Sequence, residues 1–389
     1  MPAQTKAPKE TYQGFEQGPI RPPSEANSLL IRVTRNCPWN RCSFCPVYKG
    51  SRFSIRPKEH VIRDIDSVWR HIGALQQKAT DAGGLSRREL RQTIQDTDRQ
   101  DLQAFNAALN WYTTGMRSIF LQDANSLIVK PAHLIEILGH LRLRFGDVER
   151  ITSYARSHTI SRIKDADLQA MRDNSLNRIH IGLESGSDQV LKLVGKGVTK
   201  ATHIKAGLKV VKAGMELSEY VMPGLGGRDL SQAHALETAD ALNRINPHFI
   251  RLRTLALPNG IPLFDAWQAG RFDKCSDVEM AQETLLFLET LDGINSVVKS
   301  DHILNLFQEV EGTLPEDKDH MTGVLKDFLA LAPDQQCLYQ VGRRLGVFSR
   351  LSDMQNTYRR EKTEQICREL GVTPDNVDQV IDELMKRFI

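Results

Sequence analysis

Residues 28–46 read SLLIRVTRNCPWNRCSFCP, in which a short apolar run leads directly into three closely spaced cysteines. The apolar residues 29–33 predict a buried β-strand that ends at Thr34. The cysteines that follow, Cys37, Cys42 and Cys45, have the spacing C-x4-C-x2-C. A loop at the carboxyl end of a strand can direct three thiolates at one point. This stretch therefore predicts a metal centre at the end of the first strand.

The number of cysteines narrows the kind of metal. A structural zinc site needs four ligands, and Cys275, Cys337 and Cys367 lie far away in the sequence with no pairing pattern. Three thiolates fit a four-iron cluster with one open iron, whereas an ordinary electron-transfer cluster would take a fourth cysteine. The pattern favours a [4Fe–4S] cluster whose open iron binds substrate or cofactor, and zinc remains the alternative.

Further apolar runs alternate with segments of helical spacing along the next two hundred residues. Buried strands are predicted at 118–122, 149–154, 177–183, 216–222 and 249–257, and helices at 131–145, 165–171, 199–213 and 230–245. This alternation predicts an α/β fold of repeated βα units around a parallel sheet. A doubly wound sheet and a barrel both satisfy six such strands. In either architecture the ligand site lies at the carboxyl ends of the strands.

Three glycine-containing motifs follow predicted strands. They are GLESGS at 182–187, MPGLGG at 222–227 and LPNGIPL at 257–263. Together with the cysteines, they make residues 28–272 similar to the radical S-adenosylmethionine (radical SAM) superfamily. The particular resemblance is to the branch with the Elongator catalytic subunit, anaerobic coproporphyrinogen oxidases and methylthiotransferases. The family's usual spacing is C-x3-C-x2-C, so this chain carries one extra residue in the first gap.

The resemblance implies a partial (β/α)6 TIM-type barrel that binds SAM beside the cluster. It implies that Glu184 contacts the ribose or amino group of SAM, that Lys196 faces its carboxylate, and that the Pro223–Gly224 turn lies near the adenine. Arg156, at the end of the third strand, is expected to bind SAM or another carboxylate.

One motif departs from the family pattern. Relatives carry G-G-E or a similar turn after the second strand to hold the SAM amino group, and this chain has Gln122 and Asp123 there. We expect backbone carbonyls or these two side chains to take that role. The alternative is that Asp123 or Asn125 caps a helix ahead of Leu127.

The resemblance further implies reductive cleavage of SAM to a 5′-deoxyadenosyl radical, fed by an external electron donor of flavodoxin or ferredoxin type. The substrate is unassigned. The alternative from another class is a non-catalytic iron–sulfur cluster carrier or sensor, which has no need of the three glycine motifs. A methylthiotransferase is disfavoured because the chain has no second cysteine trio.

Several polar residues at strand ends are candidates for substrate contact. Tyr154, Glu219 and Tyr220 lie on the third and fifth strands, and Arg251 and Arg253 alternate on the sixth. Two positive charges on one face favour an anionic ligand or an acidic partner. A polar group at 300–305, containing Asp301, His302 and Asn305, is predicted to lie on a helix, either capping it or acting as an acid or hydrogen-bonding group.

The predicted organisation has three parts: an extended arm at 1–27, a core at 28–272, and a helical region at 273–389. A polar insertion at 78–116, helical near 87–111, interrupts the core, and the final helix is predicted to begin with Thr373 as cap and Pro374 in its first turn.

Charge and hydropathy exclude other classes of protein. The chain has 51 Lys and Arg against 48 Asp and Glu, without a block of one sign, which favours a mixed solvated surface over a nucleic-acid footprint. Neither a membrane span nor a signal peptide is recognisable. We therefore expect a cytoplasmic protein without membrane contact, in which six cysteines do not form a disulfide scaffold.

Overall fold

The computed structural model describes residues 10–82, 92–95 and 97–385. Its centre is an eight-stranded sheet in the order β1-β4-β5-β6-β7-β8-β9-β10. The strands are β1 (Leu29–Arg32), β4 (Ser118–Gln122), β5 (Arg150–Ala155), β6 (Leu176–Glu184), β7 (Glu216–Val221), β8 (Phe249–Leu252), β9 (Val297–Lys299) and β10 (Gly312–Thr313). All neighbours pair in parallel except β9 and β10. The strands β1 and β10 are the two edges, so the sheet is an open, partial barrel.

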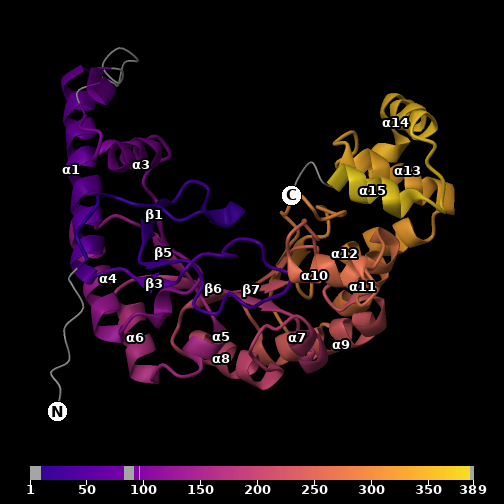
Figure 1. The fold of residues 1–389 in the computed structure, drawn as a ribbon, viewed down its shortest axis with the longest axis horizontal. Coiled ribbons are helices and arrows are strands. Elements are labelled where there is room, and N and C mark those ends of the chain that lie inside the picture. Colours follow the sequence, from indigo (N-terminus) through magenta and orange to yellow (C-terminus); the bar gives the residue numbers. More distant parts are fainter. Residues whose placement is uncertain (1–9, 83–91, 96, 386–389) are drawn as a thin grey trace.

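Helices cover the outer face of this curved sheet (Figure 1). They are α1 (Lys58–Ala82), α4 (Pro131–Arg144), α6 (Asp165–Asp173), α8 (Lys200–Lys212), α9 (Gly227–Ile245) and α11 (Asp277–Thr290). Side chains on alternate strand positions, including Ile119, Ile179, Leu217 and Ile250, are completely buried in the main apolar core. The α/β class and the six predicted strands are thereby confirmed, although the sixth ends at Leu252 and not at residue 257. Strand order selects a partial barrel over a doubly wound sheet.

The prediction that strands stop near residue 272 is wrong. The short strand β9 pairs in parallel with β8, and β10 continues the sheet. Their three and two residues are too short to show an alternating pattern. Residues 300–305 are also not helical: they form a loop after β9, where Ser300 Oγ donates to Phe307 O at 2.6 Å.

The insertion and the last helix differ from their predicted bounds. Helix α1 continues to Ala82, and α3 (Leu102–Thr113) packs against it, whereas residues 97–101 are not helical. Residues 87–91 of the predicted helix lie outside the described part of the chain. The last helix, α15 (Val377–Met385), begins four residues after Thr373, because residues 374–376 form a turn ahead of it.

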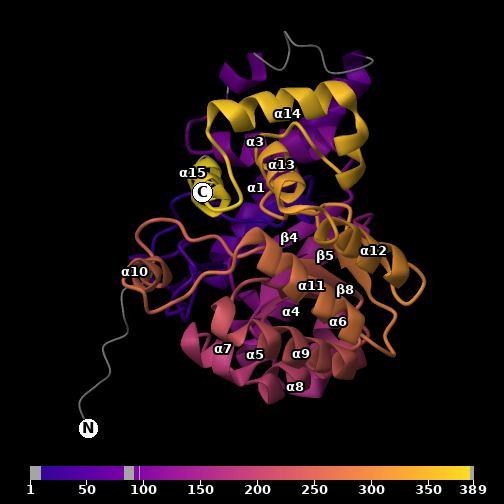
Figure 2. The same cartoon turned by 90° about the vertical axis from the view of Figure 1, so that its right-hand side faces the viewer.

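The C-terminal helices stand beyond the last strands (Figures 1 and 2). They are α12 (Lys318–Leu329), α13 (Pro333–Arg344), α14 (Thr357–Glu369) and α15. Arg344 joins them to the barrel: its side chain pairs with Asp277 at 2.7 Å and donates to Leu304 O at 2.7 Å. Both charged side chains are less than 5% exposed. Within the described residues, no helix is long and apolar enough to cross a membrane.

The buried pair predicts a strong coupling between the two parts of the protein. Arg344→Ala leaves Asp277 buried without its partner, and we expect the free energy of unfolding to fall by about 3–5 kcal/mol. Arg360→Ala is the matched control, because Arg360 forms an exposed pair with Glu364 and should cost about 0.5 kcal/mol or less. Urea unfolding of both variants measures the difference, and equal small losses would contradict the coupling.

Candidate functional site

A cavity of about 180 Å³ opens at the carboxyl ends of the parallel strands. Its lining includes the three cysteines of the first loop, Arg156 after β5, and Glu184 and Lys196 from the end of β6 onward. These six residues come from four segments that the barrel brings together: the cysteine loop, the loop after β5, the end of β6 and the loop after α7 (Asp188–Leu193). They were all singled out in the sequence, and the structure places them around one space.

The three cysteines are free thiols of intermediate exposure on the loop that follows β2 (Thr34–Arg35). Asn36 and Asn40 adopt left-handed backbone conformations there, with φ values of 65° and 44°. Among the described residues, no three His, Cys, Asp or Glu side chains are drawn together as tightly as a single metal ion requires. A four-iron cluster holds its thiolates on different irons, so its ligands stand farther apart.

The first cysteine gap, which contains one residue more than in the family, includes Trp39. This side chain attaches the cysteine loop to the segment around Gly195. Trp39 Nε1 donates to Gly195 O at 2.7 Å. The guanidinium groups of Arg41 and Arg156 lie 5.2 and 5.0 Å from the centre of the indole ring. A Cβ at Gly197 would stand 2.2 Å from the same ring, so only glycine allows this approach.

Glu184 and Lys196 form an ion pair of 2.9 Å inside the cavity. Glu184 has φ 64°, and a Cβ at Gly182 would lie 2.2 Å from its Oε1. Burial alone would lower the pKa of Lys196, but the Glu184 carboxylate and the Cys42 sulfur hold this pKa above its usual value. Burial lowers the pKa of Arg156. The site thus keeps two cations beside its cysteines.

Gln122 and Asp123 have protein partners. The Gln122 amide accepts from Gly18 N at 2.8 Å and donates to Ile20 O at 2.6 Å, which fastens the N-terminal arm over the end of β4. Asp123 pairs with Arg32 at 2.6 Å and accepts from Asn36 N at 2.9 Å. Neither residue lines the cavity, although Ile20 and Ala124 do. Their contact with SAM stays a prediction.

The predicted cap at this turn is wrong. Asn125 does precede a short 3-10 helix, η2 (Ser126–Ile128), but its side chain makes no capping hydrogen bond. It accepts instead from Arg156 N at 3.0 Å and donates to Thr159 at 2.8 Å. Asn125 therefore fixes the backbone at the start of the Arg156 loop.

The Pro223–Gly224 turn lies beside the cavity, and side chains of α9 and α11 form hydrogen bonds to its backbone. Gly224 has φ 83° and donates its N–H to Glu283 at 2.7 Å. His234 contacts Met222 O through Nε2 at 3.0 Å. Met222 lines the cavity, whereas Pro223 and Gly224 do not.

The substrate candidates separate into two groups. Tyr154, Tyr220 and Arg253 line the cavity, with Tyr154 and Tyr220 ring centres 6.5 Å apart. Glu219 is completely buried, does not line the cavity, and neither of its carboxylate oxygens has a hydrogen-bond partner among the described residues. Because neighbouring strand residues alternate in direction, Glu219 faces the helical layer.

Sequence reasoning missed several residues of the cavity wall. Phe44, Tyr48 and His203 line it, and Lys196 lies 5.7 Å from the centre of the Phe44 ring. His203 contacts Ser157 at 2.7 Å, and burial lowers its pKa to about 3. Phe44 and Tyr48 adjoin the cysteines in sequence, which was the available signal. His203 lies in the first turn of α8, and its sequence surroundings gave no such signal.

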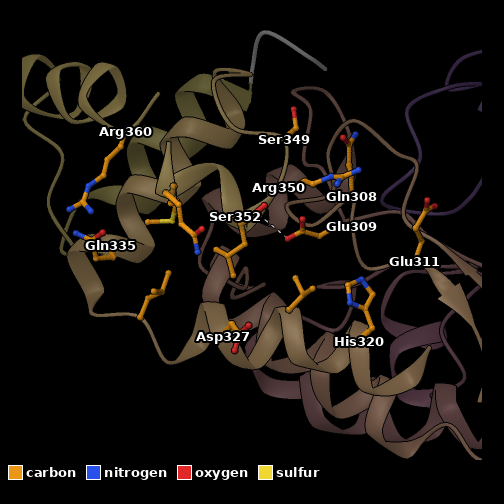
Figure 3. A pocket seen from close by; sticks show the side chains of 15 residues that line it. Gln308, Glu309, Glu311, His320, Asp327, Gln335, Ser349, Arg350, Ser352 and Arg360 are labelled. Carbon is orange, nitrogen blue, oxygen red and sulfur yellow. Dashed lines mark hydrogen bonds between the residues drawn. The ribbon is translucent and has the colours of Figure 1, made fainter. Parts of the chain in front are cut away.

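Larger hollows lie elsewhere. One of about 970 Å³ lies among the C-terminal helices, where Glu309, His320, Asp327 and Arg350 line it together with polar residues of α13 and α14 (Figure 3). Glu309 already accepts from Leu351 N at 2.9 Å. This hollow lies away from the strand ends and contains none of the cysteines, so the smaller cavity is the candidate site.

Comparison with known proteins gives distant likenesses. No family model matches the chain. A CDK5RAP1-like protein of Oryza sativa subsp. japonica is 24% identical over 208 residues, which are 52% of this chain and 31% of that protein. The chain thus spans about a third of that relative.

Among solved structures, coproporphyrinogen III oxidase (HemN) of Escherichia coli, described as a radical SAM enzyme, aligns with 16% identity and a TM-score of 0.43, covering 67% of this chain and 52% of its own. The radical SAM methyltransferase TsrM of Kitasatospora setae, with cobalamin and a [4Fe–4S] cluster bound, aligns with 15% identity and a TM-score of 0.40, covering 61% and 36%. Each of these two proteins is described as a radical SAM enzyme.

The Trp39 contacts predict that this residue immobilises the loop around Lys196. Trp39→Ala removes the hydrogen bond to Gly195 and both guanidinium contacts, so we expect faster amide hydrogen exchange in residues 194–198. Trp69→Ala is the control, since Trp69 is an exposed indole contacted by Arg144 on the far helices. Exchange mass spectrometry reads both, and unchanged exchange in Trp39→Ala would refute the role.

Glu219 predicts a pH-dependent loss of stability. Burial raises the pKa of Glu219 well above its usual value, so the folded state keeps a proton that the unfolded state releases. The resulting cost is absent below the unfolded pKa and grows as pH rises, by at most about 1.4 kcal/mol per pH unit. Glu219→Gln should therefore stabilise the protein more at pH 8 than at pH 5 in urea unfolding. Glu216→Gln, on the same strand, is the control, and a difference independent of pH would count against this assignment.

Proposed function

We propose that this chain is a radical SAM enzyme that binds one [4Fe–4S] cluster through Cys37, Cys42 and Cys45 and cleaves S-adenosylmethionine reductively. The observation that carries the proposal is the content of a single cavity, in which three free thiols share the lining with the Glu184–Lys196 pair and Arg156. A site that binds only a metal centre does not need the Glu184–Lys196 ion pair or the second cation, Arg156, in the same cavity.

The residues of the cavity fit both a [4Fe–4S] cluster and SAM. Three thiols without a fourth protein ligand suit a cluster with one open iron. Lys196 and Arg156 are cations that suit the carboxylate of SAM, and Glu184 can accept hydrogen bonds from its amino group or ribose. The Pro223–Gly224 turn would lie toward the adenine. A reduced cluster held by the three cysteines would supply the single electron needed for reductive cleavage of the C5′–S bond of SAM.

The protein's own role is to position the bound cofactor and substrate and to exclude water from the cavity. Phe44, Val47 and Met222 give the cavity an apolar wall, and Ile20 of the N-terminal arm lies over it. Lys196 and Arg156 keep positive charge where anionic groups would bind. The electron has to come from outside, and we propose a donor of flavodoxin or ferredoxin type and a cytoplasmic location for the reaction.

The alternative, a non-catalytic cluster carrier or sensor, shares the cysteines and differs in the rest of the cavity. A carrier makes no use of the Glu184–Lys196 pair. SAM cleavage is therefore the property that separates the two functions.

The test is anaerobic reconstitution with iron and sulfide, reduction with dithionite, addition of SAM and chromatographic assay for 5′-deoxyadenosine. We expect the product with the unaltered protein and its loss in Cys42→Ala, together with loss of the cluster's absorption. Cys275→Ala is the matched control, because Cys275 is buried away from the cavity and should change neither signal.

Glu184→Gln separates cluster binding from SAM binding. It keeps the three thiols and removes the carboxylate, so we expect full iron content and SAM binding weakened about tenfold or more. Full iron in Cys42→Ala would refute the ligand assignment. A cluster that binds no SAM and yields no 5′-deoxyadenosine would replace the enzyme with the carrier.

A further inference from the structure

Arg253 is a cation without a protein partner in the candidate cavity. Its side chain is exposed and lines the cavity. Within the described ranges, its guanidinium makes no hydrogen bond and no ion pair, although its backbone N–H donates to Val221 O at 2.9 Å. Arg251, two residues earlier, differs in this respect: it is buried and pairs with Asp301 at 2.7 Å.

Two groups near Arg253, Tyr220 and His302, are neutral at physiological pH. Burial raises the pKa of Tyr220 to about 12 and lowers the pKa of His302 to about 4, and Arg253 acts electrostatically on both residues. The Tyr220 hydroxyl is buried, and hydrogen bonding to the Tyr154 hydroxyl contributes to its pKa. Asp301, the neighbouring acid, is engaged by Arg251. The positive charge of Arg253 and the neutral phenol of Tyr220 therefore lie together on one side of the cavity.

The part of the cavity around Arg253 and Tyr220 differs from the part around the cysteines, where Arg156 and Lys196 lie. Arg156 and Lys196 act electrostatically on Cys42, whereas Arg253 acts on Tyr154, Tyr220 and His302. Arg253 follows β8, while Arg156 follows β5 and Lys196 lies beyond β6. One cavity thus offers two separate places for negative charge.

We propose that Arg253, with the hydroxyl of Tyr220, binds an anionic oxygen group of the substrate, a carboxylate or a phosphate, and that the substrate is a small organic anion. The inference rests on the proposed function and names its substrate class. A guanidinium binds both anions through paired hydrogen bonds, and a neutral phenol adds a third donor. The apolar wall formed by Phe44 and Met222 suits the carbon body of such a molecule.

The experiment measures binding of three matched probes to the reconstituted protein: phenylacetate, phenyl phosphate and the neutral phenylacetamide. We expect one or both anions to bind about tenfold tighter than the amide. The better anion identifies the carboxylate or the phosphate. Arg253→Gln should reduce this preference to about twofold or less, Arg253→Lys should keep part of it, and Tyr220→Phe should weaken anion binding severalfold.

Arg244→Gln is the control, since Arg244 is an exposed arginine on α9 outside the cavity, and it should leave the preference unchanged. SAM affinity should also be unchanged in Arg253→Gln. Three results would overturn the proposal: no preference for either anion in the unaltered protein, a preserved preference in Arg253→Gln, or weakened SAM binding in that variant. The titration is repeated without SAM, so that anion binding is measured independently of SAM binding. A failure of the Arg253 proposal can then be told apart from a failure of the proposed function.

Discussion

Three successive backbone carbonyls hold the candidate site together. Val194 O accepts from Ser43 N at 2.9 Å, Gly195 O from Trp39 Nε1 at 2.7 Å, and Lys196 O from Arg156 Nη2 at 2.7 Å. The donors come from the cysteine loop and from the end of β5, and the acceptors follow the end of α7 (Asp188–Leu193). These bonds join three loops that the sheet alone would leave independent. The position of Lys196 relative to the cysteines depends on them.

The constraint matters because Lys196 carries its charge in a buried place. An ammonium group removed from water is costly unless a partner compensates it. Glu184 supplies that partner, and its left-handed backbone at φ 64° is the local cost of directing the carboxylate inward. The surrounding hydrogen bonds offset the backbone strain at Glu184 and the desolvation of Lys196. Such an arrangement adds little to stability by itself, which is the usual sign that a site is built for a ligand.

The fold was predictable because its signals are local. The core strands alternate with helical segments, and each loop motif follows a strand end, so sequence order placed the cysteines and Glu184 at one edge. The resemblance to the radical SAM family added Lys196. What failed depends on contacts between distant residues. The amide of Gln122 binds the arm at Gly18, and Asn125 supports Arg156 instead of capping a helix. Strand β9 is formed through its pairing with β8, a contact its own three residues cannot encode.

Arg251 on β8 and Arg253 just after it show the same limit of sequence reasoning. The alternation predicted that both share a face and need negative charge, but it could not show which of them the protein itself neutralises. Asp301 resolves this, because the loop after β9 brings its carboxylate to Arg251 and leaves Arg253 without a partner. The loop is held in that position from several sides: Asn305 accepts from Thr254 N at 2.9 Å and donates to Leu252 O at 2.9 Å, and Arg344 binds Leu304 O. The C-terminal helices therefore hold this loop through Arg344, while Asp301 neutralises Arg251 and leaves Arg253 as the unpaired cation at the cavity.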